Sequence, residues 1–235
     1  MKIAVAQIEV DEDINTNLKK ILHYIDLAKD ADLICFPETC LNGEEEVIDV
    51  SKHVKRIQKK CKEKSIYCIF GSYVPKMNKN RNVIFLINRE GKILYKYYKV
   101  HLYKTEKASI VAGKTNRLVQ TEFGPIGIIN CWDFAFPSYI QKLSKKGARV
   151  IFCPSYLVSH KEDGPALRSI PLVRAFENLS YYISCDACTD ETLSESYICH
   201  PQKVLKKIRK KEGIIFADLD FAEIDRLRAE YDHLC

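Results

Sequence analysis

The spacing of hydrophobic residues predicts alternating strands and helices along the first half of the chain. Residues 2–9 alternate apolar and polar positions, which is typical of a strand with one buried face. Residues 15–29 follow a helical period, and the apolar face consists of Leu18, Ile21, Leu22, Ile25 and Ala28. The other elements predicted here are a strand over 32–36, a helix over 44–64 and strands over 66–74, 83–88 and 92–98, with turns at 80–82 and 89–91.

The second half of the chain also alternates predicted strands and helices, and it ends in a helix. A helix near 171–180 has a proline in its first turn, which is tolerated there, and Leu172, Phe176 and Leu179 as a buried stripe. The other elements predicted here are strands over 118–122, 127–130 and 150–154, strands near 181–185, 197–200 and 213–219, and helices over about 137–146 and over 220–231. No linker rich in Pro, Gly or Ser divides the chain, so we predict one α/β domain over residues 1–235. Two sheet-forming halves with their own helices indicate two sheets packed face to face, with the helices outside.

Composition narrows the possible partners. The chain is 46% hydrophobic and 29% charged, which excludes wholesale disorder. Much of the net charge of +6 lies in two Lys-rich stretches, 52–64 and 203–211, which we interpret as a solvated exterior. We expect no nucleic-acid partner, because zinc-finger spacing and RNP-like aromatic motifs are both absent.

No apolar run approaches the roughly 18 residues that span a bilayer. The N-terminus reads as a strand and not as a secretory signal, so we expect no membrane partner and a cytoplasmic location.

Ten cysteines raise the question of disulfides or metal. Most lie inside apolar runs, such as Cys35, Cys68 and Cys153, where free cysteine behaves as a small buried hydrophobe. Cys185 and Cys188 form one CxxC pair, but a zinc site needs a second pair or histidines at ligand spacing. We therefore expect reduced thiols, no metal and no cofactor.

Three reactive residues follow the ends of predicted strands. Glu38 comes after Phe36-Pro37, Lys99 ends a strand, and Cys131 lies where a strand runs into a helix that begins with proline. Partial burial raises the pKa of a carboxylate toward useful base strength, and a lysine in a dry site can stabilise an oxyanion. Backbone N–H groups at the sharp turn are expected to lower the pKa of the thiol. Together the three residues supply a nucleophile, a base and a cation.

With these residues in view, the chain resembles the carbon–nitrogen hydrolases of the nitrilase superfamily, in their amidase-like branch. The matching segments are Ala6-Gln7 with Asn17, Phe36-Pro37-Glu38 with Gly43, Lys99-Val100-His101-Leu102, Cys131-Trp132-Asp133 with Pro137, Pro154-Ser155, and Arg174-Ala175-Phe176-Glu177-Asn178. The resemblance implies a four-layer α-β-β-α sandwich and a Glu-Lys-Cys triad. Cys131 would attack an amide carbonyl, Glu38 would act as the base, and Lys99 with the backbone N–H of Trp132 would hold the oxyanion.

The resemblance also suggests further roles and an assembly. Glu106 is the candidate for a second glutamate that positions Lys99 or the substrate amine, although it could equally be a loop residue. His101 reads as structural support, and the segment Arg174–Asn178 as scaffold. Tyr156 and His160 are candidates for substrate binding because they follow a strand end. Family members commonly pair through helices that flank the second sheet, so a homodimer or larger homo-oligomer is expected.

Departures from the family pattern leave the substrate open. Ala135 and Ser138 stand where many amidases have arginine and glutamate, so the pocket and its ion pairs should differ. Asp133 favours a small linear amide or N-carbamoyl compound over a nitrile, because nitrilases typically have glutamate there. The alternatives are a cysteine peptidase using Cys131 with His101 or His160, and a binding protein that has kept the fold but lost activity.

Overall fold

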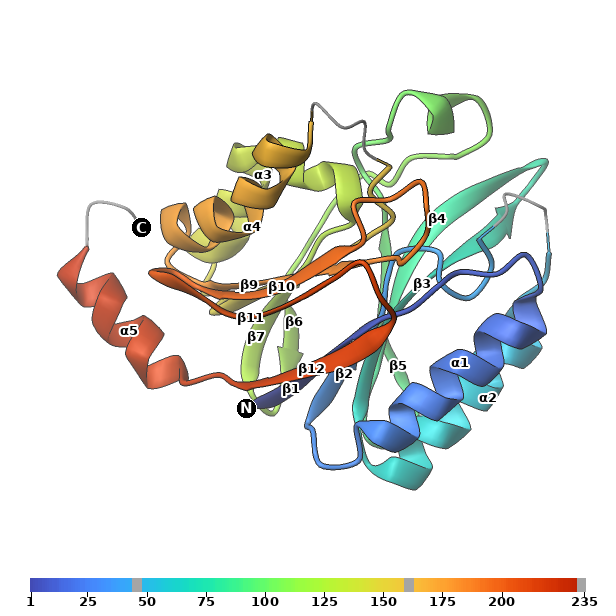
Figure 1. Cartoon of the computed structure of the whole chain (residues 1–235), viewed down its shortest axis with the longest axis horizontal. Helices are drawn as coiled ribbons and strands as arrows, with labels where there is room; N and C mark the ends of the chain where they lie inside the picture. The colour runs from blue at the N-terminus through green and yellow to red at the C-terminus, as the bar shows by residue number, and fades with distance from the viewer. Residues whose placement is uncertain (44–47, 159–162, 232–235) are drawn as a thin grey trace.

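The computed structural model describes residues 1–43, 48–158 and 163–231, which form two six-stranded sheets covered by helices (Figure 1). The first sheet has the strand order β12-β1-β2-β3-β4-β5, with β12 (Gly213–Asp218), β1 (Lys2–Gln7), β2 (Leu33–Cys35), β3 (Tyr67–Lys76), β4 (Lys79–Ile87) and β5 (Ile93–Tyr98). The second has the order β11-β10-β9-β8-β7-β6, with β11 (Lys203–Arg209), β10 (Glu195–His200), β9 (Tyr181–Asp186), β8 (Val150–Ser155), β7 (Gly124–Ile128) and β6 (Val119–Thr121).

Each sheet has parallel strands in its middle and antiparallel strands beside them. Strands β1, β2 and β3 run parallel in the first sheet, as β7, β8 and β9 do in the second. Strand β12 returns from the C-terminal part of the chain and pairs antiparallel with β1. The carboxyl ends of β2 and β8 approach the same region from the two sheets, because the N–H of Glu38 after β2 donates to the carbonyl of Ser155 at the end of β8.

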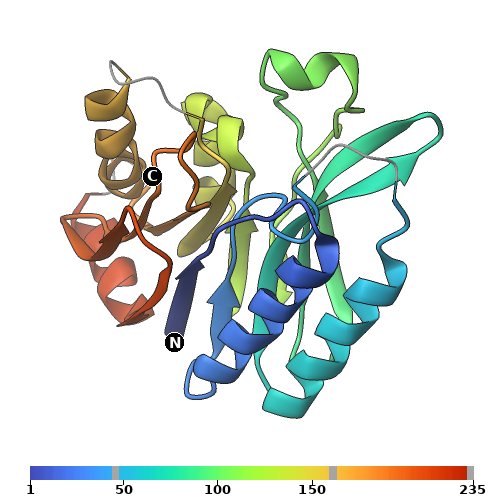
Figure 2. The same cartoon turned by 45° about the vertical axis from the view of Figure 1, so that its right-hand side comes forward.

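The two sheets pack against each other through alternating side chains. Ile3, Val5 and Leu33 of the first sheet share one buried cluster with Phe152 and Ile183 of the second. The helices α1 (Ile14–Leu27) and α2 (Ser51–Lys64) cover the outer face of the first sheet, and α3 (Pro137–Lys145) and α4 (Gly164–Glu177) cover that of the second (Figure 2). The predicted α-β-β-α sandwich is therefore confirmed. Helix α5 (Phe221–Glu230) packs at one end, where Ile224 joins the cluster between the sheets.

Two helix predictions were wrong at their beginnings. Helix α2 begins at Ser51 and not at residue 44; residues 48–50 are not helical, and 44–47 lie outside the described part of the chain. Helix α4 begins at Gly164, so Pro165 takes the first-turn place that was assigned to Pro171. Pro171 and Ala175 then form the buried face, and Phe176 is turned outward with 46% of its surface exposed. Phe176 therefore does not belong to a buried stripe.

One segment predicted as a turn belongs to a strand, and one stretch for which no element was predicted contains another strand. Residues 80–82 belong to β4, and the turn lies at Met77, whose φ of +58° is left-handed. The Lys-rich stretch 203–211 contains β11, an edge strand whose lysines are all exposed. Lysines on an edge strand hinder pairing with other chains, which explains a strand with so little apolar character. None of the described helices is both long enough and apolar enough to cross a membrane.

Candidate active site

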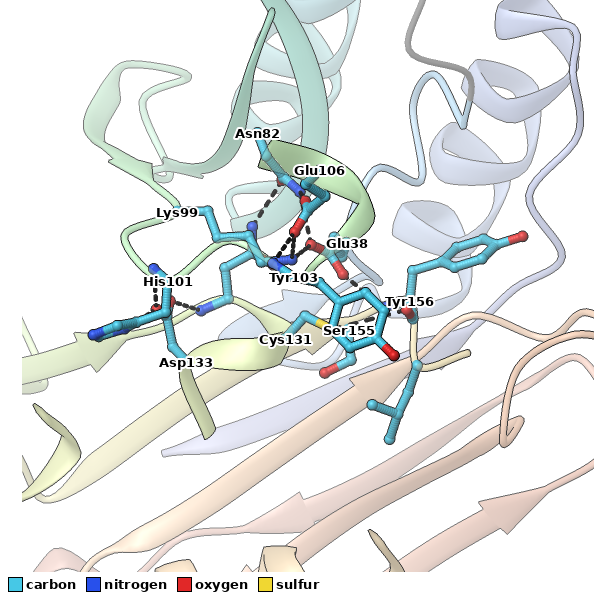
Figure 3. A network of polar contacts seen from close by, with 12 residues as sticks. Glu38, Asn82, Lys99, His101, Tyr103, Glu106, Cys131, Asp133, Ser155 and Tyr156 are labelled. Atoms are coloured by element: carbon cyan, nitrogen blue, oxygen red, sulfur yellow. Dashed lines mark hydrogen bonds and ion pairs between the residues drawn. The ribbon is translucent and has the colours of Figure 1, made fainter. Parts of the chain in front are cut away.

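Three strand ends bring Glu38, Lys99 and Cys131 together between the sheets (Figure 3). Glu38 follows β2, Lys99 follows β5, and Cys131 begins the 3-10 helix η2 (Cys131–Ala135) after β7. The Nζ atom of Lys99 lies 2.7 Å from Oε1 of Glu38 and 2.8 Å from Oε2 of Glu106, which lies in η1 (Thr105–Ala108). The Sγ atom of Cys131 donates to the backbone carbonyl of Tyr156 at 3.8 Å, and the Glu38 carboxylate lies near enough to act on the thiol electrostatically. The structure thus groups a thiol, an ammonium and two carboxylates, all of them buried.

The backbone at Glu38 is held from both sheets. The N–H of Glu38 donates to the carbonyl of Ser155 at 3.3 Å, and the N–H of Tyr156 donates to Oε2 of Glu38 at 2.8 Å. Gly71 of β3 passes so close that a Cβ atom there would lie 2.3 Å from the nitrogen of Thr39. Only glycine allows this approach, so β3 fixes the turn that carries the carboxylate.

The backbone at Cys131 is strained and is supported by a buried aspartate. Cys131 has a φ of +44°, an unusual conformation for a residue with a side chain. Asp133, two residues later, accepts hydrogen bonds from the N–H of Asn130 at 2.9 Å and from the hydroxyl of Tyr97 at 2.6 Å. It also accepts one from the N–H of His101 at 3.0 Å. These bonds hold the turn in the conformation that exposes the thiol to the site.

His101 contacts this support and not the thiol. Its Nδ1 lies 2.7 Å from Oδ1 of Asp133, and its ring stacks on Phe136 with a centroid distance of 3.7 Å. Figure 3 shows the imidazole pointing away from Cys131. The geometry does not favour His101 as the base of a cysteine peptidase, and His160, the other candidate, lies outside the described residues.

A buried amide that the sequence did not reveal connects the two carboxylates. The Nδ2 atom of Asn82 donates to Oε1 of Glu38 at 2.7 Å and to Oε1 of Glu106 at 2.9 Å. Its Oδ1 atom accepts from the Asn130 amide at 2.8 Å, and its backbone carbonyl accepts from the N–H of Lys99 at 2.9 Å. In the sequence, Asn82 is part of a turn signal. Its only distinguishing feature is that an apolar strand follows directly.

Burial dominates the electrostatics of the site. It raises the pKa of Glu38 above its usual value, although Lys99 opposes that rise. Burial alone would lower the pKa of Lys99, but Glu38, Cys131 and Glu106 keep it well above its usual value. Burial, followed by the nearby Glu38, also raises the pKa of the Cys131 thiol well above normal. The expectation of a lowered thiol pKa was therefore wrong, because desolvation and a negative neighbour outweigh the backbone N–H groups. A thiol whose pKa is raised in this way is neutral at neutral pH, so it would need a base in order to act as a nucleophile.

A cavity of about 470 Å³ opens onto these groups. Of the three residues predicted to bind substrate, Trp132 and Tyr156 line it, and His160 is not described. Ala135 and Ser138 do not line the cavity, so these departures from the family act elsewhere. Asp163 and Leu167, from the segment 161–168 that follows the same strand end and was a candidate for the pocket, also line it. The further lining side chains that the sequence did not indicate include Tyr73, Tyr103, Thr105, Leu157, Val158 and Glu191. They come from separate parts of the chain, including β3 and η1, and no local sequence pattern distinguishes them.

The CxxC pair is not part of a metal-binding arrangement. Within residues 1–43, 48–158 and 163–231, no three or more His, Cys, Asp or Glu side chains are grouped to hold a metal ion. The Cys185 thiol is buried and donates to the carbonyls of Ala6 and Cys35, both at 3.4 Å. Cys188 is half-buried and lines an outer cleft, not the cavity at Cys131.

Comparison with known proteins identifies the family. The family model described as carbon-nitrogen hydrolase matches residues 2–229. A probable nitrilase from Schizosaccharomyces pombe is 28% identical over 242 residues, covering 93% of this chain and 88% of the relative. The 2-oxoglutaramate amidase of Bacillus subtilis is 27% identical over 232 residues, covering 90% of this chain and 87% of the relative.

Solved structures show the same fold. Nit3 of Saccharomyces cerevisiae, a member of branch 10 of the nitrilase superfamily, superposes with a TM-score of 0.88 at 24% identity. That match covers 98% of this chain and 94% of Nit3. An amidase from Nesterenkonia sp. AN1, solved as a mutant with acrylamide added to its active-site cysteine, gives a TM-score of 0.85 at 21% identity. It covers 99% of this chain and 98% of the amidase chain.

Proposed function

Because the chain belongs to the carbon–nitrogen hydrolase family of the nitrilase superfamily, we propose that it hydrolyses a small linear amide or N-carbamoyl compound through a thioester on Cys131. Membership makes it a hydrolase of carbon–nitrogen bonds other than peptide bonds. The observation that carries the finer proposal is the convergence of the Cys131 thiol, the Glu38 carboxylate and the Lys99 ammonium on one cavity. Each step below needs all three groups at the same bound molecule.

Acylation begins with the neutral thiol. Glu38 accepts the thiol proton while Sγ of Cys131 attacks the amide carbonyl carbon, forming a C–S bond and an oxyanion. Lys99 and the backbone N–H of Trp132 stabilise that oxyanion. Glu38 then returns the proton to the amide nitrogen, the C–N bond breaks, and ammonia or an amine leaves. The acyl group stays on sulfur as a thioester.

Deacylation uses the same carboxylate, again first as a base and then as an acid. Glu38 takes a proton from water, and the resulting hydroxide adds to the thioester carbon. The C–S bond breaks, and Glu38 returns the proton to the sulfur of Cys131. The sum is amide plus water giving carboxylic acid plus ammonia. The raised pKa of Glu38 suits both directions, because a stronger base accepts the proton of a neutral thiol or of water more readily.

The test is ammonia release from a panel of ω-amides, N-carbamoyl amines and nitriles. We expect turnover of an amide or N-carbamoyl compound by the native protein and none by Cys131→Ala. Lys99→Ala should lose at least about 100-fold in kcat/KM, because an oxyanion stabiliser is removed. Lys96→Ala is the matched control, because Lys96 is an exposed lysine on β5, the strand that Lys99 follows, and this variant should keep full activity.

The other outcomes separate the alternatives. Full activity in Lys99→Ala would indicate a Cys-His enzyme, which does not depend on that ammonium. Binding of amides without any release of ammonia would indicate a binding protein. The expected homodimer or larger homo-oligomer stays a prediction, which light scattering on the eluting protein measures directly.

A further inference from the structure

Negatively charged side chains outnumber positively charged ones in the lining of the catalytic cavity. Among its described lining residues, Lys99 is the one lysine or arginine, against the carboxylates of Glu38, Glu106, Asp163 and Glu191. Lys99 is already bound to two of those carboxylates, at 2.7 and 2.8 Å. Among the described residues that line the cavity, there is therefore no unpaired cation for a negatively charged group on a substrate. Such a group would lose its hydration without gaining an ion pair in return.

Four aromatic side chains also line the cavity. They are Tyr73, Tyr103, Trp132 and Tyr156, and the rings of Tyr103 and Trp132 meet edge to face with centroids 5.0 Å apart. Aromatic faces carry partial negative charge and attract ammonium and guanidinium groups. The rings and the carboxylates of Asp163 and Glu191 thus favour the same kind of ligand by two different interactions.

Acidic residues also outnumber basic ones in the lining of the cleft that leads to the cavity. An outer cleft of about 770 Å³ shares Gly43, Tyr156 and Glu191 with the catalytic cavity. Its lining adds the four acidic residues Glu9, Asp11, Glu12 and Asp190, of which Glu9 is paired with Lys20 at 3.1 Å. Arg168 and Lys210 also line this cleft, but Arg168 is engaged at 2.8 Å by the buried Glu195. The protein as a whole carries a net charge of +6, so an acidic entrance is a local feature and not a consequence of composition.

We propose that the substrate is an amide or N-carbamoyl compound with a positively charged group, an ammonium or guanidinium, at the end away from the scissile bond. This inference rests on the proposed function, since it assumes that the amide carbon lies at Cys131. The cationic end lies toward Asp163 and Glu191 and against the tyrosine rings. The relative named 2-oxoglutaramate amidase acts on an anion, so this chain is expected to differ from it in substrate charge.

Three amides of equal length test the proposal. In 4-aminobutanamide, pentanamide and glutaramate, three methylene groups separate the amide from an ammonium, a methyl and a carboxylate. We expect kcat/KM for 4-aminobutanamide to exceed that for glutaramate at least about tenfold at low salt, with pentanamide between them. Because Asp163 and Glu191 are exposed, the preference should shrink as ionic strength rises. Equal rates, or a preference for glutaramate, would overturn the proposal.

Variants assign the preference to the two carboxylates. Asp163→Asn and Glu191→Gln should each lower the ratio of kcat/KM between 4-aminobutanamide and pentanamide by about fivefold. The matched control is Glu63→Gln, which removes one negative charge from an exposed residue in the last turn of α2 that lines neither cavity. An unchanged ratio in both cavity variants, or an equal change in Glu63→Gln, contradicts the assignment.

A binding measurement separates this inference from the proposed chemistry. Trp132, the one tryptophan of the chain, lines the cavity, so its fluorescence reports occupancy in the inactive Cys131→Ala variant. Tighter binding of 4-aminobutanamide than of glutaramate supports the inference even if the native protein releases no ammonia, a result that would refute the proposed function alone. Tighter binding of glutaramate refutes the inference and leaves the proposed function standing.

Discussion

Replacing Asn82 should change the pH at which the enzyme gains activity. Its Nδ2 atom donates to Oε1 of Glu38 at 2.7 Å and to Oε1 of Glu106 at 2.9 Å, and its side chain is buried. Asn82→Ala removes both donors and adds no charge. A hydrogen bond to an ionised carboxylate favours the charged form, so its loss raises the pKa of Glu38 further. Glu38 must be ionised to accept the thiol proton, and the acid limb of kcat/KM should therefore move to higher pH.

The size of the shift follows from the bond that is lost. A hydrogen bond to a charged group contributes about 1.5–3 kcal/mol, and one pKa unit corresponds to about 1.4 kcal/mol. Water entering the space left by the amide would restore part of this, and Lys99 and the N–H of Tyr156 still contact Glu38. We therefore expect the acid limb to rise by about one pH unit. Asn82→Asp should raise it more, because a third carboxylate adds repulsion to the lost donors.

The assay is ammonia release against pH on the preferred substrate. Asn178→Ala is the matched control, since Asn178 is a buried amide at the end of α4 whose Nδ2 atom bonds the carbonyl of Arg174. It should lose stability but keep the native pH profile. If Asn82→Ala loses activity with an unshifted acid limb, the residue acts only through general packing and the reasoning fails.

Three other variants test separate features of the structure. Gly71→Ala should lower kcat/KM by about 100-fold in a protein that still folds, because the new Cβ would displace the backbone at Thr39 and Glu38; ammonia assays and thermal melting check this. Limiting iodoacetamide should label Cys131 before the buried Cys40 and Cys153, and Glu38→Gln should remove that preference, as read by peptide mass spectrometry; equal labelling would contradict an activated thiol. Burial raises the pKa of Glu195, but hydrogen bonds from Tyr197, Arg168 and Arg209 outweigh it and lower that pKa below its usual value. Ionised Glu195 therefore stabilises the folded protein fully at pH values above the pKa of this residue in the unfolded chain. That stabilisation is lost as the pH falls through the lower pKa that Glu195 has in the folded protein. Glu195→Gln should cost about 2 kcal/mol in urea unfolding at pH 7, and progressively less in acid.

The sequence predicted the parts of the site that lie at strand ends. Glu38, Lys99 and Cys131 each follow an apolar run, and a polar residue directly after a buried strand is visible in one dimension. Their meeting follows from the two-sheet architecture, because the strand ends share one edge. The N-terminal end of α4 was harder to predict, because Pro165 and Pro171 both suit the first turn of a helix. Only packing against the second sheet determines which of them lies in that turn.

The residues that tune the site were not predictable in the same way. Asn82 contacts Glu38 and Glu106 across sequence separations of 44 and 24 residues, and its neighbours resemble a turn. The sign of the Cys131 pKa shift depends on how far burial and Glu38 outweigh the local N–H groups, which is a property of the folded site. The acidic lining has the same character, because Asp163 and Glu191 belong to loops 28 residues apart that converge only in the fold.

Glu106 offers the sharpest test of how the buried charges work together. Lys99 shares its charge between two carboxylates, at 2.7 and 2.8 Å, and Glu106 raises the pKa of Glu38 through repulsion. In Glu106→Gln that repulsion disappears and Lys99 pairs with Glu38 alone, so the pKa of Glu38 falls. The acid limb of kcat/KM should then move to lower pH by about half a unit to one unit, while the plateau falls because Glu38 has become a weaker base. This shift is opposite to that expected for Asn82→Ala, although both variants remove one partner from the same network. Shifts in the same direction would show that the network supports the site only by holding its shape.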